Sequence, residues 1–419
     1  MAIVPPEFEY SGEFPRRKMF ARLSRIDQLG DGRRARVSYE FDAVDAALSP
    51  EGVTDAIQTP ENTEPFALLR IVTTQNKFGS VTGIDAPQVG QWYHFSLAPR
   101  KEASGPIVFH AQLVAGGYNA LSRGVLAEGE MLFSEEERRP PPQPLGASTT
   151  STYAEAFQVS QKCGFPLAAV VTTNEIKSLI SPLPAPAYIV VRDVGQASFC
   201  TIYNETNEAI FHYDAGWPLV FNGRTAPKKF ELPFGKHPII LSHWDFDHLL
   251  SFYRFPMVRD CKWITPIQKL GPGAKKIASV LASKGNLLGW NGNSLISRYI
   301  EMYRCTGAPN DANGSGIAVI LRLKSQKVAL LVGDANYEQV PAKAGTKFDA
   351  LAVTHHGALF EGYVPSPVHP GSKCVVSVGR ANVYQHPKEE ALRKHRKVRW
   401  NVQRTSGTLL YPRGDRKLS

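Results

Sequence analysis

The pattern of apolar and polar residues divides the chain into a β-rich first part, a proline-rich stretch and a mixed remainder. Five early segments alternate apolar with polar residues or are rich in β-branched and aromatic ones: 17–26, 34–41, 66–74, 91–97 and 107–114. Turns such as Gly30-Asp31-Gly32 separate them, and we find no competing segment with a helical period. Alternation with a period of two is typical of half-buried strands. The pattern predicts a small all-β domain over residues 1–133, with an OB-like barrel as one option for its fold.

The stretch 134–152 has the composition of a linker. Acidic residues and Arg138-Arg139 precede the run Pro140-Pro141-Pro142-Gln143-Pro144, and Gly, Ser and Thr follow. Consecutive prolines keep the backbone extended, which suits a spacer between domains. Residues 153–419 are then expected to form a second domain, opening with one or two short helices within 153–181.

Strand and helix patterns alternate in this second domain. Apolar, β-branched runs predict strands at 188–192, 209–213, 238–241 and 348–353, and a hairpin-like pair at 317–323 and 328–332. Residues 274–283, which follow Gly271-Pro272-Gly273, predict a helix, and a further helix is expected to begin near residue 249. This order indicates an α/β fold.

Four potential metal ligands follow the apolar run 238–241 within six residues: His243, Asp245, Asp247 and His248. The binding sites of α/β sheets lie where strands end, so these side chains are well placed for chemistry. Burying them without a cation would cost several kcal/mol in desolvation. A helix cap with solvated Asp and His residues is the alternative interpretation. Asp334, His355 and His356 also follow predicted strands, with a turn residue and a core histidine pair as their structural alternatives.

These motifs resemble, in order, those of the metallo-β-lactamase superfamily. The segment L-S-H-W-D-F-D-H at 241–248 is similar to the HxHxDH signature, with Asp245 at the second His, a variant that resembles the hydrolase domain of ComEC-type DNA-uptake proteins. The further matches are Asp193-Val194-Gly195-Gln196, Asp214-Ala215-Gly216, Gly333-Asp334-Ala335, His355-His356-Gly357 and Asn382 to Pro387, where Gln385 replaces the usual Gly. The resemblance runs from about residue 188 to the C-terminus, and it implies an αββα sandwich.

The resemblance also implies a metal-dependent hydrolase with one or two divalent ions, manganese or zinc. It implies that His243 and Asp245 bind one metal, that Asp247, His248 and His386 bind the other, and that Asp334 bridges them. It makes Asp247, His355 and His356 the catalytic candidates, with His355 or His356 protonating the leaving oxygen. Which late histidine is a ligand and which is the acid stays open. Three residues are expected to support the ligands from behind: Asp193, Asp214 and Asn382.

One ligand of the superfamily pattern has no counterpart here. No histidine occurs between His248 and His355. The first metal is therefore expected to be absent or held weakly, by water or by Asn310, Asp311 or Asn313. A carboxylate at position 245 adds a hard oxygen ligand, which suits Mn²⁺ or Mg²⁺ better than an all-histidine site does.

Charge indicates the class of partner. The 419-residue chain has a net charge of +10, and residues 388–419 carry ten Lys or Arg residues against three acidic ones. Such a run can follow a phosphate backbone. The nucleic-acid-binding candidates are Arg393, Lys394, Arg396 and Lys397. Trp92, Tyr93 and Phe95 either stack on bases or belong to the core of the first domain.

Cysteine usage and hydropathy bear on the compartment. The five scattered cysteines form no CxxC pair, so we expect free thiols in a reducing cytoplasm. No signal-like leader and no apolar run of about 18 residues occurs, so no membrane association is expected, unlike in ComEC-type proteins. The sequence leaves the oligomeric state and a partner subunit open.

Together these observations predict a phosphodiesterase, with a nuclease acting on DNA or RNA as the first choice. One alternative is a hydrolase of a small phosphodiester or another small ester, because one fold hosts many chemistries. The other is a sensor or binding subunit whose incomplete site has little or no turnover.

Overall fold

The computed structural model describes residues 14, 16–30, 35–135, 147–233, 235–341, 345–409 and 411–419. The chain divides into two compact units, which are described separately. The first comprises residues 1–165 together with 269–280, and the second comprises 166–268 together with 281–419. This division differs from the linker predicted at 134–152. Residues 136–146 of that stretch lie outside the described residues. Its last residues, 147–152, belong to helix α3 (Ala147–Lys162).

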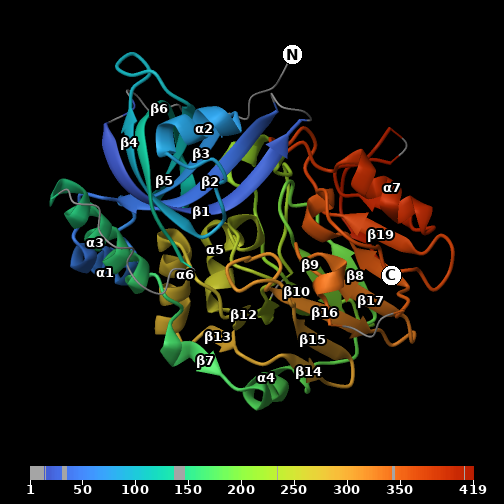
Figure 1. The fold of residues 1–419 in the computed structure, drawn as a ribbon. Coiled ribbons are helices and arrows are strands. Elements are labelled where there is room, and N and C mark those ends of the chain that lie inside the picture. Colours follow the sequence, from blue (N-terminus) through green and yellow to red (C-terminus); the bar gives the residue numbers. More distant parts are fainter. Residues whose placement is uncertain are drawn as a thin grey trace. The chain divides into compact units, whose positions relative to one another are not determined.

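The first unit is built on a closed β-barrel (Figure 1). Its strands run β1-β2-β3-β5-β6-β4, and β4 pairs with β1 to close the ring. Their bounds are Arg17–Leu29 (β1), Arg36–Asp45 (β2), Phe66–Thr73 (β3), Gln91–Ala98 (β4), Ile107–Val114 (β5) and Gly117–Ser134 (β6). The five predicted strands are confirmed, but the pattern missed β6. Gly124 interrupts the apolar–polar alternation of β6. Only glycine fits at this position, because a Cβ there would lie 2.6 Å from the carbonyl oxygen of Ala98.

Two helices in the first unit correct the expectation of an all-β domain. Helix α1 (Pro50–Gln58) begins after Ser49, whose side chain accepts the N–H of Gly52. Helix α2 (Gln75–Thr82) begins after Thr74 and ends at Gly83, which adopts a left-handed conformation with φ of 75°. The Ser-Pro start and the Gly end were readable in the sequence as helix boundaries. The six-stranded barrel does not confirm an OB-like fold, which has five strands.

The aromatic residues of β4 are buried, Tyr93 and Phe95 in the barrel core and Trp92 against the ring of Phe133. Trp92, Tyr93 and Phe95 are fully buried, and the Phe41 ring meets those of Tyr93 and Phe95 edge to face. Stacking on bases requires an exposed ring face. The interpretation that these three residues stack on bases is therefore wrong, and the interpretation that they are buried within the first domain is confirmed.

Two sheets form the second unit. The first has the order β21-β8-β9-β10-β11-β12-β13-β7, and the second has the order β14-β15-β16-β17-β18-β19-β20. The first sheet comprises Val170–Val171 (β7), Tyr188–Val191 (β8), Cys200–Tyr203 (β9), Ala209–Tyr213 (β10), Ile239–Ile240 (β11), Trp263–Pro266 (β12), Leu287–Trp290 (β13) and Arg416–Lys417 (β21). The second comprises Ser294–Ile296 (β14), Ile300–Arg304 (β15), Ile317–Arg322 (β16), Val328–Leu331 (β17), Ala350–Ala352 (β18), Lys373–Val376 (β19) and Asn401–Arg404 (β20).

The two sheets share one hydrophobic core. Ile202, Phe211 and Ile264 of the first sheet are buried in the same cluster as Val319 and Leu331 of the second. A second cluster joins the other face of the second sheet to helix α7 (Glu389–Lys397) through its buried residues Ala391 and Leu392. A sandwich of two sheets with a helix on an outer face is the mixed α/β architecture that the sequence predicted. The other helices of this part are α4 (Thr173–Ile180) and α5 (Ser251–Arg254).

Helix α6 (Pro272–Ser283) connects the parallel strands β12 and β13, but residues 269–280 belong to the first unit. The buried carboxylate of Asp42 accepts the N–H groups of Gly273 and Ala274 at distances of 2.8 and 3.0 Å. The buried amine of Lys276 donates to the carbonyl groups of Ala56, Thr59 and Asn62. Burial raises the pKa of Asp42 to about 7 and lowers that of Lys276 to about 8. Two buried ionisable groups therefore anchor α6 in the first unit.

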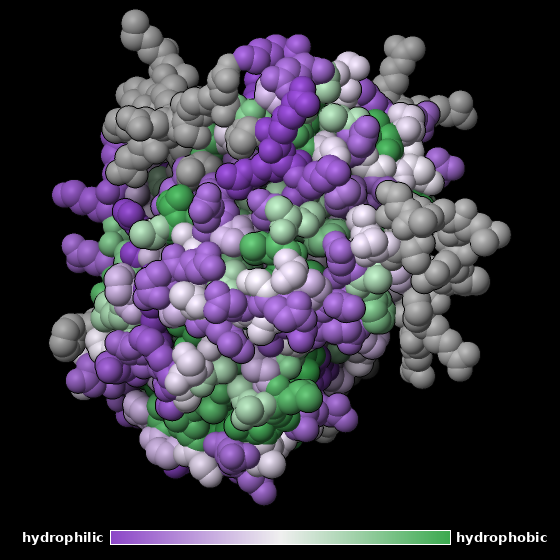
Figure 2. All heavy atoms as spheres, turned by 90° about the vertical axis from the view of Figure 1, so that its left-hand side faces the viewer, coloured by the Kyte–Doolittle hydropathy of each residue, from purple (hydrophilic) through white to green (hydrophobic). Residues whose placement is uncertain are grey.

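On the face drawn in Figure 2, hydrophilic residues prevail and hydrophobic ones gather near the bottom of the view. Among the described residues, none of the helices is both long and apolar enough to span a bilayer. All five cysteines are buried and unbridged, in keeping with the expected free thiols.

Candidate metal centre

The segment with the highest density of potential ligands follows β11, as the sequence predicted. Its backbone is held from two sides, because the N–H of Ser242 donates to Oδ1 of Asp214 at 2.7 Å and its carbonyl accepts the N–H of Ile317 at 2.8 Å. A short 3₁₀ helix, η3 (Phe246–His248), turns the chain so that Asp247 and His248 are both buried. The local structure thus directs several polar side chains inward.

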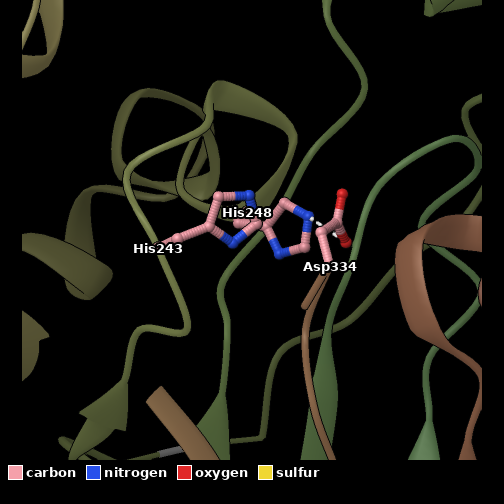
Figure 3. A group of neighbouring side chains, drawn as sticks. All are labelled: His243, His248 and Asp334. Carbon is pink, nitrogen blue, oxygen red and sulfur yellow. Dashed lines mark ion pairs between the residues drawn. The ribbon is translucent and has the colours of Figure 1, made fainter. Parts of the chain in front are cut away.

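A first triplet consists of His243, His248 and Asp334, with ligand atoms that all lie within 4.8 Å of one another. Figure 3 shows both imidazoles on the loop after β11, and the carboxylate on a separate segment beside them. Nε2 of His248 lies 3.1 Å from Oδ1 of Asp334. Asp334 follows β17, so the two sheets contribute ligands to one place.

A second triplet consists of Asp247, His248 and His356, again within 4.8 Å. Nε2 of His356 lies 3.3 Å from Oδ2 of Asp247. His356 belongs to the 3₁₀ turn η6 (Thr354–Gly357), in which His355 and His356 have φ values of 47° and 51°. Two successive non-glycine residues in the left-handed region are strained, and such strain is concentrated at functional sites. His248 belongs to both triplets.

The hydrogen bonds behind the histidines fix which ring nitrogen carries the proton. Nδ1 of His356 lies 2.7 Å from the carbonyl oxygen of Ser377, so it must donate. Nδ1 of His248 lies 2.8 Å from Oδ2 of Asp214, which likewise accepts. In the neutral form of each ring, the Nε2 lone pair therefore faces the site, as a metal ligand requires. The hydroxyl of Ser242 lies 3.0 Å from Nδ1 of His243 and can support that ring in the same way.

The residues present fit a divalent cation. Within the described residues, the buried Nε2 atoms of His243 and His356 have no hydrogen-bond partner. Buried polar atoms without partners are rare in proteins and call for a ligand. Imidazole nitrogens combined with carboxylate oxygens are ligands for zinc, manganese and iron alike. The site is therefore compatible with divalent metal binding, and the donor set alone does not select the metal.

Electrostatics of the site also favour positive charge. Burial lowers the pKa of His248, but the carboxylates of Asp334 and Asp214 outweigh burial and hold this pKa well above its usual range. Burial raises the pKa of Asp334, but His248 and, after it, His355 and His356 outweigh burial and hold this pKa well below its usual range. Buried carboxylates thus stabilise a cation at the centre of the cluster, whether a proton on imidazole or a metal ion.

Three predicted site residues, the ligand candidates Asp245 and His386 and the catalytic candidate His355, belong to neither triplet. Asp245 is 8% exposed, and its Oδ2 lies 3.5 Å from Nε2 of His243. His355 contacts Asp334, with 3.5 Å between Nε2 and Oδ2, and its ring centroid lies 5.8 Å from that of His386. His386 is buried, and its role as a ligand of the second metal stays a prediction, while His356 lies beside Asp247. Neither triplet includes the substitute ligands Asn310, Asp311 or Asn313.

The residues expected to support ligands divide into two kinds. Asp214 holds His248 directly, and Asn382 bonds through its side chain to both the N–H and the carbonyl of His386. Asp193 instead forms a two-bond ion pair with Arg413 and accepts the N–H of Gly195. The structure therefore corrects the role of Asp193, which anchors the C-terminal segment rather than a ligand.

Two conformations explain features of the motifs. Gly333 has φ of 59°, and a Cβ there would lie 2.5 Å from the Cβ of Ser242, so glycine is required beside the cluster. Gln385 has φ of 61°, in the region that glycine adopts freely. The resemblance has glycine at this position, and the backbone shape is kept here although the residue differs.

Sequence reasoning missed Ser198, Ser242 and Ser377, which support the ligands. Ser198 donates its hydroxyl to Oδ2 of Asp214 at 2.9 Å, and Ser242 and Ser377 contact histidines as described. Ser242 adjoins His243 in the sequence, so its position within the motif was an available signal. The role of Ser377 depends on its backbone carbonyl, which no residue type reveals.

The basic residues of α7 are partly committed to internal contacts. Arg393, Arg396 and Lys397 are exposed at helical spacing. Lys394 donates to the carbonyl of Phe360 and lies over its ring, so this candidate serves packing. Arg396 also pairs with Glu389. The three exposed residues, Arg393, Arg396 and Lys397, are called the α7 basic face below.

Comparison with known proteins gives little further information. No protein-family model matches the chain, and no curated protein matches it. Among solved structures, an archaeal metallo-β-lactamase superfamily protein from Sulfolobus tokodaii is similar at 17% identity and a TM-score of 0.25. The match covers 56% of this chain and 82% of that one. A TM-score of this size does not establish a common fold, so the proposal below rests on this chain's own residues.

Proposed function

We propose that the protein is a metal-dependent hydrolase that cleaves phosphodiester bonds in DNA or RNA. The observation that carries the proposal is the pair of triplets sharing His248, in which buried carboxylates and correctly oriented imidazoles converge at the ends of strands from both sheets. The ordered motifs that resemble the metallo-β-lactamase superfamily, and its ComEC-type members in particular, support the same reading.

Five residues would hold the metal: His243, Asp247, His248, Asp334 and His356. A bound divalent ion lowers the pKa of a water molecule and neutralises charge on phosphate oxygens. Because His248 belongs to both triplets, its single Nε2 serves one ion at a time. The stoichiometry of one or two ions is therefore part of what the experiment below measures.

The two neighbouring histidines suit different tasks. The side chain of His356 is only 2% exposed, and its proton is held on Nδ1 by the carbonyl of Ser377, so Nε2 has none to donate. The side chain of His355 is 20% exposed and reaches the rim of the cluster beside Asp334. His355 is therefore assigned as the general acid that protonates the leaving oxygen, and His356 as a ligand.

Charge supports a polyanionic substrate. The chain carries a net charge of +10. Helix α7 begins three residues after His386, and the N–H of Lys388 donates to the carbonyl of Gly357, directly after the two histidines. The helix with the α7 basic face thus starts beside the proposed acid, where cationic side chains can neutralise backbone phosphates.

The test uses the purified full-length chain, stripped of metal and refilled with Mn²⁺ or Zn²⁺. Labelled single-stranded DNA, duplex DNA, RNA, cyclic dinucleotides and a chromogenic small ester are offered in parallel, with the metal content measured. Cleavage of a polynucleotide that is lost in Asp334→Ala supports the proposal. Cleavage of cyclic dinucleotides or the ester alone identifies a small-substrate hydrolase, and binding without turnover identifies a sensor or binding subunit.

A further inference from the structure

A buried hydrogen-bond chain connects helix α7 to the turn that carries the two histidines. The hydroxyl of Tyr337, in the 3₁₀ turn η5 (Tyr337–Gln339), lies 2.8 Å from Nε2 of His395 and 3.2 Å from the backbone nitrogen of Thr354. Tyr337 is 2% exposed and His395 is fully buried. Nothing in the proposed chemistry uses either residue.

The direction of every bond in this chain is determined. Nδ1 of His395 lies 2.8 Å from the carbonyl oxygen of Ala391, so Nδ1 carries the proton and Nε2 accepts. The hydroxyl of Tyr337 therefore donates to His395, and its oxygen accepts the N–H of Thr354. Burial raises the pKa of Tyr337 and lowers that of His395, so both residues keep the neutral forms that this arrangement needs. Each donor in this chain thus has an acceptor, and each acceptor has a donor.

The chain ends at a strained part of the backbone. Thr354 immediately precedes His355 and His356, whose φ values are both positive. The hydroxyl of Thr354 also donates to the carbonyl of Ala335 at 2.7 Å. Thr354 is thus bound twice to the segment 335–337, which directly follows Asp334. Strained conformations persist only where their surroundings hold them.

We propose that Tyr337, itself held by His395, is a positioning residue that keeps the His355–His356 turn in place relative to Asp334. Through this contact the geometry of two candidate ligands, Asp334 and His356, depends on a helix that follows the last motif in the sequence. The inference rests on the metal site of the proposed function and is independent of the substrate.

The test measures Mn²⁺ and Zn²⁺ affinity of the full-length protein by competition with a chromophoric chelator, well below the unfolding midpoint. Tyr337→Phe keeps the ring and removes the hydroxyl, and we expect the affinity to fall about three- to tenfold, less than for a direct partner of a ligand. Tyr303→Phe is the matched control, because its hydroxyl donates to Glu301 on the same strand and contacts no ligand histidine among the described residues.

If Tyr337→Phe proves too unstable, the metal affinity of variants at position 395 provides a second measurement. His395→Leu removes the acceptor and is expected to weaken metal binding, whereas His395→Gln retains an acceptor and is expected to restore most of the affinity. Wild-type metal affinity in both Tyr337→Phe and His395→Leu would overturn the inference, as would an equal loss in Tyr303→Phe. A protein that binds metal but cleaves no polynucleotide refutes the proposed substrate and leaves this test intact.

Discussion

Replacing Asp214 with asparagine should weaken metal binding without unfolding the protein, because it changes a proton position rather than a ligand. The Asp214 carboxylate accepts three hydrogen bonds, from the N–H of Ser242, the hydroxyl of Ser198 and Nδ1 of His248. Its backbone is left-handed, with φ of 58°, a conformation that asparagine tolerates. The substitution therefore keeps the shape and the backbone while removing one acceptor.

The orientation of the new amide follows from its neighbours. The N–H of Ser242 can only donate, so the amide oxygen stays there and the NH₂ group faces His248. Two donors cannot bond, so Nδ1 of His248 has two options. It either loses its proton to Nε2, and a protonated Nε2 cannot bind a metal, or it turns to the hydroxyl of Ser242 at 3.2 Å, which already contacts Nδ1 of His243. The second option gives up the bond to a charged acceptor, at a cost of about 1–3 kcal/mol. The metal dissociation constant should rise about 10- to 100-fold.

Metal affinity is measured by chelator competition, and the His248 tautomer by ¹⁵N NMR of the imidazole rings in the Zn²⁺-loaded protein. Ser198→Ala is the control, because it removes a donor to the same carboxylate without changing the His248 tautomer, and we expect little change in affinity. If Asp214→Asn binds metal with wild-type affinity while His248 keeps its proton on Nδ1, the reasoning about this hydrogen bond is wrong.

Four further predictions follow from the site and the surface. Asp334→Ala should abolish cleavage of a labelled oligonucleotide while the circular dichroism spectrum stays native, and wild-type turnover would exclude the assigned site. The Asp245 carboxylate lies 3.5 Å from Nε2 of His243 and can add a hard oxygen to the five metal-holding residues, so wild type should be faster with Mn²⁺ than with Zn²⁺. Asp245→His should shift the ratio of the two rates toward Zn²⁺, and an unchanged ratio contradicts a hard-ligand role for Asp245. Neutralising the α7 basic face should reduce the slope of log affinity against log salt by up to about 2–3, and an unchanged slope means that these charges face away from the substrate. Burial and, after it, Arg17 lower the pKa of His110 from 6.5 to about 4, so about 3 kcal/mol of stability is present above pH 6.5 and is lost as the pH falls toward 4; urea unfolding of wild type and His110→Gln across this range should show a shallower pH dependence in the variant.

The parts of the fold that the sequence revealed are those with strong local patterns. Strands β10, β16 and β17 and helix α6 appear within a residue or two of their predicted bounds because their apolar runs are long and bounded by turn residues. The pattern missed strand β6 because glycines interrupt it, and it missed helices α1 and α2 because they are short. Local pattern is weak wherever tertiary packing decides the conformation.

The site was predictable in its residue types and not in its pairings. The first triplet spans about 90 residues of sequence, from His243 to Asp334. The order of the motifs nevertheless predicted that its members belong to one site. The position of His356 beside Asp247 could not be foreseen, because it depends on a turn with two positive φ values and on the carbonyl of Ser377. Similarly, nothing in the residue type of Asp193 separates an ion pair with Arg413 from support of a ligand.

The anchoring of α6 bears on how such a gene could be assembled or re-engineered. A chain that begins at residue 166 retains the helix between β12 and β13 but lacks Asp42 at its first turn and the carbonyl groups that surround the amine of Lys276. In such a chain Lys276 lacks the three carbonyl groups that accept hydrogen bonds from its amine in the full-length protein. Exchange of the leading domain by recombination would therefore require compensating changes within α6. We expect the two units to be inherited together, and a domain-swapped chimera to need redesign at position 276 before it folds.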